Sequence, residues 1–242
     1  MAAGILSCGF AAPKPKGDLV YCSYARRGAA GLGSDYCELI ADSGTVPKVV
    51  VVMNEGNRFD EPVIRREYPV GKETVDSLAG ILDEANVYKL NGYSLEESIT
   101  GGHSYRIHME YSSGDKVNAY WYGHAVKDKA IAAYNLIQHF FRPWCEQAEK
   151  DARVEQLSVR VAQMEQLYDK VLKAVRKKKA YPELHDDVNS LDWYLGSGQW
   201  KNDFEADEKG LLPQELKKGV LSEDGLYNLL EDERLHKLLR NR

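Results

Sequence analysis

The sequence predicts an α+β protein in which an N-terminal antiparallel sheet with helices on one face precedes a C-terminal helical module containing a long helical hairpin. From residue 18 to 122 the apolar residues mostly follow the two-residue period of strands, whereas beyond residue 146 they recur every three or four residues. Charged residues are also denser after this point, making up 37 of 97 residues against 32 of 145 before it. We therefore expect a flexible lead-in over residues 1–17, an α+β domain over 18–143 and the helical module over 146–242.

Four short runs rich in β-branched and aromatic residues begin the predicted sheet. They read DLVYCSY, DYCELIA, KVVVVMN and EPVIRREY, and the segments between them carry turn residues. Strands joined by such short loops pair as antiparallel neighbours. The runs therefore predict a meander.

Two helices and a hairpin complete the predicted domain. Val75, Leu78, Leu82 and Ala85 lie on one stripe of an amphipathic helix. After a loop around NGYSLEESITGG, the runs HSYRIHMEY and KVNAYWY flank the turn SSGD and predict a hairpin. The run VKDKAIAAYNLIQHFF predicts a second helix, which we expect Pro143 to end because proline lacks the N–H that a helix interior needs.

A long apolar seam marks the second half of the chain. Its residues alternate spacings of three and four without a break, and such a seam needs a partner helix: Val154, Leu157, Val161, Met164, Tyr168, Val171 and Val175. A second helix offers Leu184, Val188, Leu191 and Leu195. The short connector containing proline favours a hairpin closed within the chain, and pairing between chains is the alternative. Ser222 is expected to begin a third helix as its N-cap.

The stretch GSGQWKNDFEADEKGLLP, residues 196–213, is the most site-like part of the sequence. A calcium-binding loop starting at Asp203 fails, because Glu208 stands where glycine is needed and Gln214 where the bidentate glutamate belongs. We expect no metal here. Instead, aromatic side chains such as Trp200 should anchor the segment while its acidic side chains face water.

Other candidate residues suggest a ligand or partner surface. Arg26 and Arg27 lie at a loop where they could meet an anion, and Tyr120 and Tyr122 alternate with Trp121, which is expected in the core. His124 and Trp200 complete this candidate surface. No catalytic constellation and no cofactor-binding motif is found, and no two histidines form a convincing metal pair.

The four cysteines contain no CxxC pair, so a zinc knuckle or thioredoxin-like motif is excluded. Cys22 and Cys37 would be able to pair across a hairpin in an exported protein, but free buried thiols are the expected state. The apolar run ending near Cys8 is too short for a secretory signal, which favours the cytoplasm. If the start has been trimmed, export or lipid anchoring at Cys8 is the alternative.

Composition narrows the classes of partner. The net charge is −5 and the isoelectric point is near 5.8, which argues against non-specific nucleic-acid binding. No run approaches the roughly 20 apolar residues that span a bilayer, so no integral membrane segment is expected.

The C-terminal residues resemble a known family. The stretches MEQLYDKVLKAV and LDWYLGSGQWKNDFEADEKGLLPQELKKGVLSEDGLYNLLED are similar to the bacterial domain-of-unknown-function 4298 family, over about residues 155–242. This resemblance implies a small helical module and a bacterial origin, and it implies no activity.

These observations predict a non-enzymatic protein that binds a protein partner, or itself, through the helical module. The alternative is a small-ligand-binding protein or enzyme with a site between the sheet and the helical module, using residues such as Arg26, Tyr120, His124 and Trp200.

Overall fold

The computed structural model describes residues 12–28, 34–54, 64–97, 101–123 and 126–240. Cys8, His124 and most of the predicted lead-in lie outside these ranges. The chain divides into two compact units, residues 1–149 and 150–242, and each is described by itself.

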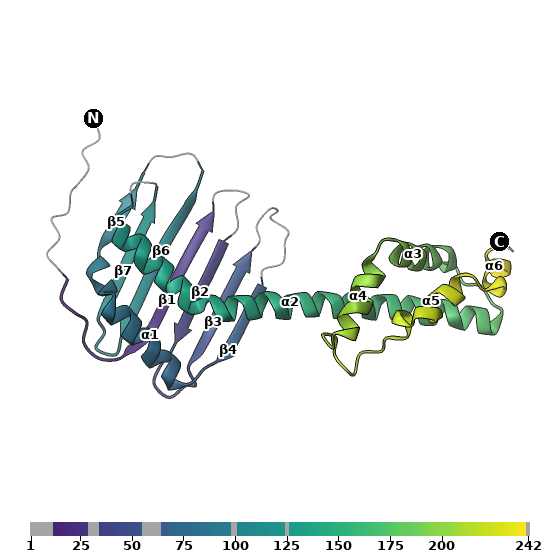
Figure 1. Ribbon diagram of the computed structural model, residues 1–242, viewed down its shortest axis with the longest axis horizontal. Helices are drawn as coiled ribbons and strands as arrows, with labels where there is room; N and C mark the ends of the chain where they lie inside the picture. Colours follow the sequence, from purple (N-terminus) through teal and green to yellow (C-terminus); the bar gives the residue numbers. More distant parts are fainter. Residues whose placement is uncertain (1–11, 29–33, 55–63, 98–100, 124–125, 241–242) are drawn as a thin grey trace. The chain divides into compact units, whose positions relative to one another are not determined.

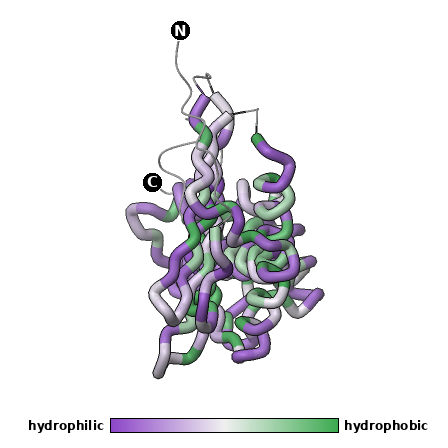
Figure 2. The backbone as a smooth tube through the Cα atoms, turned by 90° about the vertical axis from the view of Figure 1, so that its left-hand side faces the viewer, coloured by the Kyte–Doolittle hydropathy of each residue, from purple (hydrophilic) through white to green (hydrophobic). Residues whose placement is uncertain are grey.

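The first unit is built on a sheet whose seven described strands have the order β4-β3-β2-β1-β6-β7-β5. The predicted meander is β1 Leu19–Gly28, β2 Ser34–Ile40, β3 Lys48–Asn54 and β4 Ile64–Pro69, and the predicted hairpin is β6 His103–Tyr111 with β7 Lys116–Tyr122. Neighbouring strands in these two sets are antiparallel, and β1 joins the sets by pairing with β6. Figure 2 shows the short hydrophobic stretches of the chain separated by hydrophilic ones.

One strand lies where the sequence predicts a loop. The segment assigned to a loop contains β5 Tyr93–Glu96, which pairs with β7 in parallel at the edge of the sheet. It follows the short helical turn η1 Val87–Leu90. Because β5 has four residues and is flanked by turn residues, its pattern is too short to distinguish from a loop.

Two helices cover one face of the sheet (Figure 1). They are α1 Lys72–Glu84 and the first part of α2 Asp128–Lys177. On α1, Val75, Leu78 and Leu82 are buried as predicted, whereas Ala85 lies just after the helix and is exposed. The core between the layers includes Trp121, which confirms its predicted place.

The predicted helix end at Pro143 is wrong, because α2 continues through the proline to Lys177. Phe141 before the proline and Ala148 after it are both fully buried in the core of the first unit. Packing on both sides of Pro143 therefore offsets the hydrogen bond that the proline removes. The local propensity of proline predicts a helix end at Pro143, but tertiary contacts on both sides keep the helix continuous.

The second unit contains the rest of α2 together with α3 Leu184–Gly196, α4 Gln199–Glu208, η2 Gly219–Leu221, α5 Glu223–Leu230 and α6 Glu233–Arg240. Within this unit α3 runs back along α2, forming the predicted hairpin (Figure 1). Val161, Val171 and Val175 of the seam pack in one core with Leu184 and Leu191 of α3. The seam is thus covered within the chain, as the connector favoured. Ser222 is the N-cap of α5, although its side chain makes no capping hydrogen bond.

Candidate functional site

The outer face of the sheet, opposite α1 and α2, carries a group of hydrogen-bonded phenols. The hydroxyls of Tyr21 and Tyr36 lie 2.7 Å apart, and each donates to the same Glu38 oxygen, at 2.7 and 2.5 Å. Burial raises the pKa of Tyr36, and also that of Tyr21. Both phenols therefore stay protonated and hold the carboxylate as hydrogen-bond donors.

His108 continues this polar surface on β6. Its Nδ1 lies 2.7 Å from Asn118 Oδ1, its Nε2 lies 2.8 Å from Glu110 Oε1, and its ring centroid is 5.4 Å from that of Tyr21. Lys116 also bonds Glu110 at 2.7 Å, and hydrogen bonds from Lys116 and His108 lower the pKa of Glu110. The group is a polar, aromatic surface in which Glu110 is paired with Lys116 and Glu38 is held by two phenols.

The predicted surface residues of the first unit lie on both faces of the sheet. Tyr120 and Tyr122 share the outer face with His108 by strand alternation, and Tyr122 donates a 2.8 Å hydrogen bond to the Gly101 carbonyl. Arg27 is exposed on that face. Arg26 points to the opposite face and pairs with Asp35 at 2.5 Å, so its charge is already balanced. His124 lies outside the described residues, and Trp200 belongs to the other unit.

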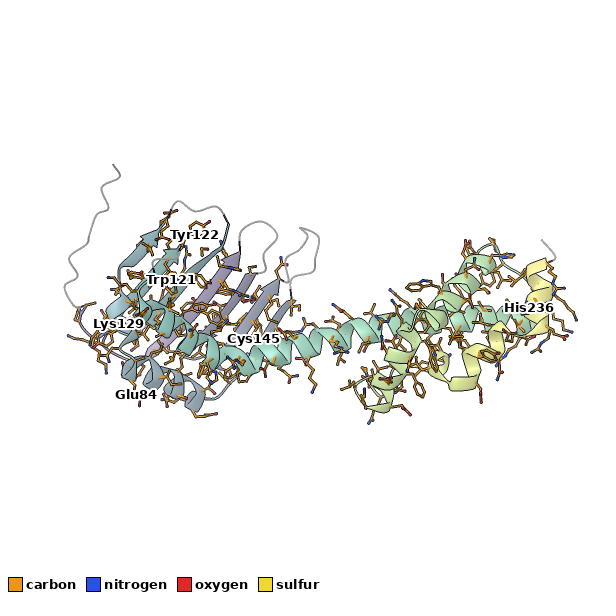
Figure 3. All side chains as sticks on the ribbon, turned by 45° about the horizontal axis from the view of Figure 1, so that its top comes forward. Glu84, Trp121, Tyr122, Lys129, Cys145 and His236 are labelled. Atoms are coloured by element: carbon orange, nitrogen blue, oxygen red, sulfur yellow. The ribbon has the colours of Figure 1, made fainter. Side chains whose placement is uncertain are left out.

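A thiol cluster lies between the sheet and α2. Cys37 Sγ on β2 is 3.4 Å from Cys145 Sγ on α2 and 3.5 Å from the hydroxyl of Tyr24 on β1. Figure 3 shows Cys145 on the part of α2 that crosses the sheet. The sequence allows a Cys22–Cys37 pair, but the cysteine that Cys37 contacts is Cys145. Since 108 residues separate the two, no sequence spacing indicated the contact.

In the helical unit, the acidic stretch predicted to face water turns inward at one residue. Asp203 on α4 is fully buried, which corrects that prediction. Its two oxygens accept hydrogen bonds from Nε and Nη2 of Arg160 on α2, the first at 2.8 Å, and Tyr194 on α3 donates at 2.9 Å. One carboxylate therefore ties α2, α3 and α4 together, because a buried charge requires such partners.

Trp200 anchors this stretch, as the sequence predicts. Trp200 stacks on Phe204 with ring centroids 5.1 Å apart, and its indole N–H donates to the Val220 carbonyl at 2.9 Å. Leu211 is exposed, and the neighbouring Leu212 is the buried anchor. Trp200 thus fastens α4 to η2.

The glycines of the same segment also serve the fold. Gly198 at the start of α4 and Gly210 after its end have φ of +79° and +66°, which favours glycine. Gly219 allows close approach of Glu165, whose Oε2 accepts the Val220 N–H at 2.6 Å, since a Cβ at Gly219 would lie 3.0 Å from that carboxylate. Glycine and acid therefore act together to place η2.

The residues that the structure describes contain no group of three or more His, Cys, Asp or Glu side chains that would hold a metal ion. In the same ranges, no helix is both long and apolar enough to cross a membrane.

Two large aromatic side chains among the described residues of the helical unit are exposed instead of buried, Trp193 on α3 and Tyr227 on α5. Trp193 on α3 is 61% exposed, although its neighbours Leu191 and Tyr194 are fully buried. Asp186 lies seven residues earlier on the same helix face and is exposed, as is Asp192. The helix contains no Lys or Arg. We call Asp186, Asp192 and Trp193 the outer face of α3.

Residues 161–239 match the model of a family described as Domain of unknown function (DUF4298), which confirms the resemblance of the C-terminal residues. No curated protein matches the chain significantly. The match covers most of the helical unit, so Asp203, Tyr194, Trp200 and the outer face of α3 lie in the segment that this family model describes, whereas Arg160 directly precedes it.

Proposed function

We propose that the chain is a bacterial, cytoplasmic, non-enzymatic protein whose helical unit acts as an adaptor by binding a partner protein. The observation that carries the proposal is the exposed Trp193 on the outer face of α3. Tryptophan is enriched among the residues that dominate protein interfaces, because a large flat ring buries much apolar area with few rotatable bonds.

The charge around Trp193 indicates the chemistry of the partner. Asp186 and Asp192 are exposed beside it, whereas Asp187 bonds Tyr181 at 2.7 Å and is turned to the unit itself. A partner surface with Lys or Arg around an apolar pocket for the indole complements this arrangement. The seam that suggested self-association is buried inside the unit, which favours a different protein over a second copy.

The test begins with light scattering on the chain as it elutes from a size-exclusion column, which gives its oligomeric state, and with capture of partner proteins from a bacterial lysate. The purified partner is then titrated against the chain to measure the affinity. We expect Trp193→Ala to weaken binding at least about tenfold, or about 1.4 kcal/mol. Tyr227→Ala is the matched control, because Tyr227 is similarly exposed but lies on α5. Added salt should weaken the complex by screening the acidic residues.

The proposal fails if the chain is a strict monomer that retains no partner, or if Trp193→Ala binds the partner as tightly as the parent.

A second candidate is small-ligand binding at the outer face of the sheet, favoured by the side chains of Tyr21, Tyr36, Glu38 and His108 grouped there. Native mass spectrometry of the purified chain tests it directly, since a retained metabolite is expected under that candidate alone.

A further inference from the structure

Three side chains that the proposed function does not use meet between the sheet and α2. Cys37 comes from β2, Tyr24 from β1 and Cys145 from α2. Cys145 Sγ lies 3.4 Å from Cys37 Sγ and 3.8 Å from the Tyr24 hydroxyl. Two thiols and a phenol in mutual contact can share hydrogen bonds, and two thiols in contact can also be oxidised together.

We propose that Cys145 is a modification site for small hydroperoxides and that Cys37 is its resolving thiol, so that oxidation joins β2 to α2 through a Cys37–Cys145 disulfide. This inference is independent of partner binding by the helical unit, because all three side chains belong to the first unit.

Exposure distinguishes the roles of the two cysteines. Cys145 is partly exposed on α2, so a small oxidant can reach it, whereas Cys37 is fully buried. A residue that solvent cannot reach is unsuited to meet the oxidant first, but it is well placed to attack an oxidised neighbour. Cys145 is therefore the attacking thiol and Cys37 the resolving one.

Hydrogen bonding favours the same order. Hydrogen bonding with Cys37 and with Tyr24 lowers the pKa of Cys145 against the opposing effects of burial and the carboxylates of Asp35 and Glu149. The hydrogen bond with Cys145 and burial raise the pKa of Cys37. The thiolate is the nucleophile in such chemistry, so Cys145 reacts and Cys37 keeps its proton until it resolves the product.

The two steps balance in atoms and electrons. The Cys145 thiolate attacks the terminal oxygen of the hydroperoxide, the O–O bond breaks, and Cys145 sulfenic acid forms while the departing alkoxide or hydroxide takes a proton. Cys37 sulfur then attacks the sulfenic sulfur, and the S–O bond breaks. The thiol proton leaves with the hydroxyl as water, which gives the disulfide. The hydroperoxide is reduced by two electrons, and the two thiols are oxidised by two.

The geometry favours this pair over the others. A disulfide is about 2.05 Å long, so the two sulfurs need to approach by only roughly 1.4 Å. Cys22 lies on β1, the strand next to β2, but the β2 residue opposite it is Leu39. The β1 residue opposite Cys37 is Tyr24, so Cys22 is not the cross-strand neighbour of Cys37. A disulfide of this kind in a reducing compartment is transient and is restored by thiols, as expected of a redox-sensitive site.

The experiment treats the purified full chain with a small molar excess of hydrogen peroxide and then unfolds it in a thiol-blocking maleimide. Digestion with trypsin follows, which separates all four cysteines onto different peptides because Lys or Arg residues lie between them. We expect the Cys37 and Cys145 peptides to appear joined, and to separate after reduction. Blocked Cys37 and Cys145 in the oxidised sample, or a disulfide that involves Cys8 or Cys22 instead, would overturn the proposal.

A pair of variants tests the order of events. In Cys37→Ala the resolving thiol is gone, so Cys145 should accumulate as sulfenic acid and form an adduct with dimedone. Cys22→Ala is the matched control, since Cys22 is equally buried, and it should still give the Cys37–Cys145 disulfide. Absence of the dimedone adduct at Cys145 in Cys37→Ala, with the variant folded by circular dichroism, would contradict the assignment. If that variant does not fold, the peptide mapping of the unmodified chain still decides the proposal.

Discussion

At the scale of single residues, Asp203 explains most about the helical unit. A carboxylate within an acidic stretch is usually solvated, and no local pattern distinguishes this one as buried. Its partners Arg160 and Tyr194 come from two other helices, and Arg160 is 43 residues away. The partner of a buried charge is selected by the tertiary fold, so local patterns predict the acid but not its role.

The Arg160–Asp203 pair leads to a stability prediction. Arg160→Ala leaves Asp203 buried with Tyr194 as its remaining donor, and breaking a buried pair in this way costs about 3–5 kcal/mol. Because the Arg160 side chain is 31% exposed, we expect the lower end of that range. Urea unfolding of the parent, Arg160→Ala, Asp203→Asn and the double variant measures the coupling, and additive losses in the double variant would contradict it.

At the scale of elements, periodicity predicted those parts whose residues face one core. Val161, Val171 and Val175 of the seam are buried, and the alternation of β6 places Ile107 and Met109 inside. The failures have a different cause. The strand β5 depends on its pairing with β7, and the continuity of α2 depends on packing against the sheet. Both are tertiary contacts, which a local sequence pattern does not predict.

Pro143 offers a direct test of the account of α2. The proline is exposed, so replacing it removes little packing, while alanine restores the missing helix hydrogen bond. We expect Pro143→Ala to raise the free energy of unfolding by about 1–3 kcal/mol, measured by urea denaturation. Glu146→Ala, at another exposed position of the same helix, is the control and should change stability little. A loss of stability in Pro143→Ala would show that the native helix requires the proline.

At the scale of the whole molecule, the chain has two units with separate hydrophobic cores. The family match falls within the second unit, and the residues that make its sequence distinctive are used inside it. Asp203 holds three helices, Trp200 and Glu165 hold η2, and Gly219 lets Glu165 approach. The sequence identified this segment, and its spacing predicts no calcium-binding loop, but the contacts explain why its acids and glycines are there.

The central claim is that this acidic segment builds the fold of the helical unit and binds no divalent cation. The measurement that tests it most directly is the thermal unfolding midpoint of the full chain, recorded while calcium or magnesium is added and then removed with a chelator. Because Arg160 and Tyr194 already occupy the oxygens of Asp203, we predict an unchanged midpoint up to millimolar concentrations. A midpoint that rises with either cation, returns with the chelator and becomes insensitive in Asp203→Asn would contradict the account, since a cation bound to the folded state must stabilise it.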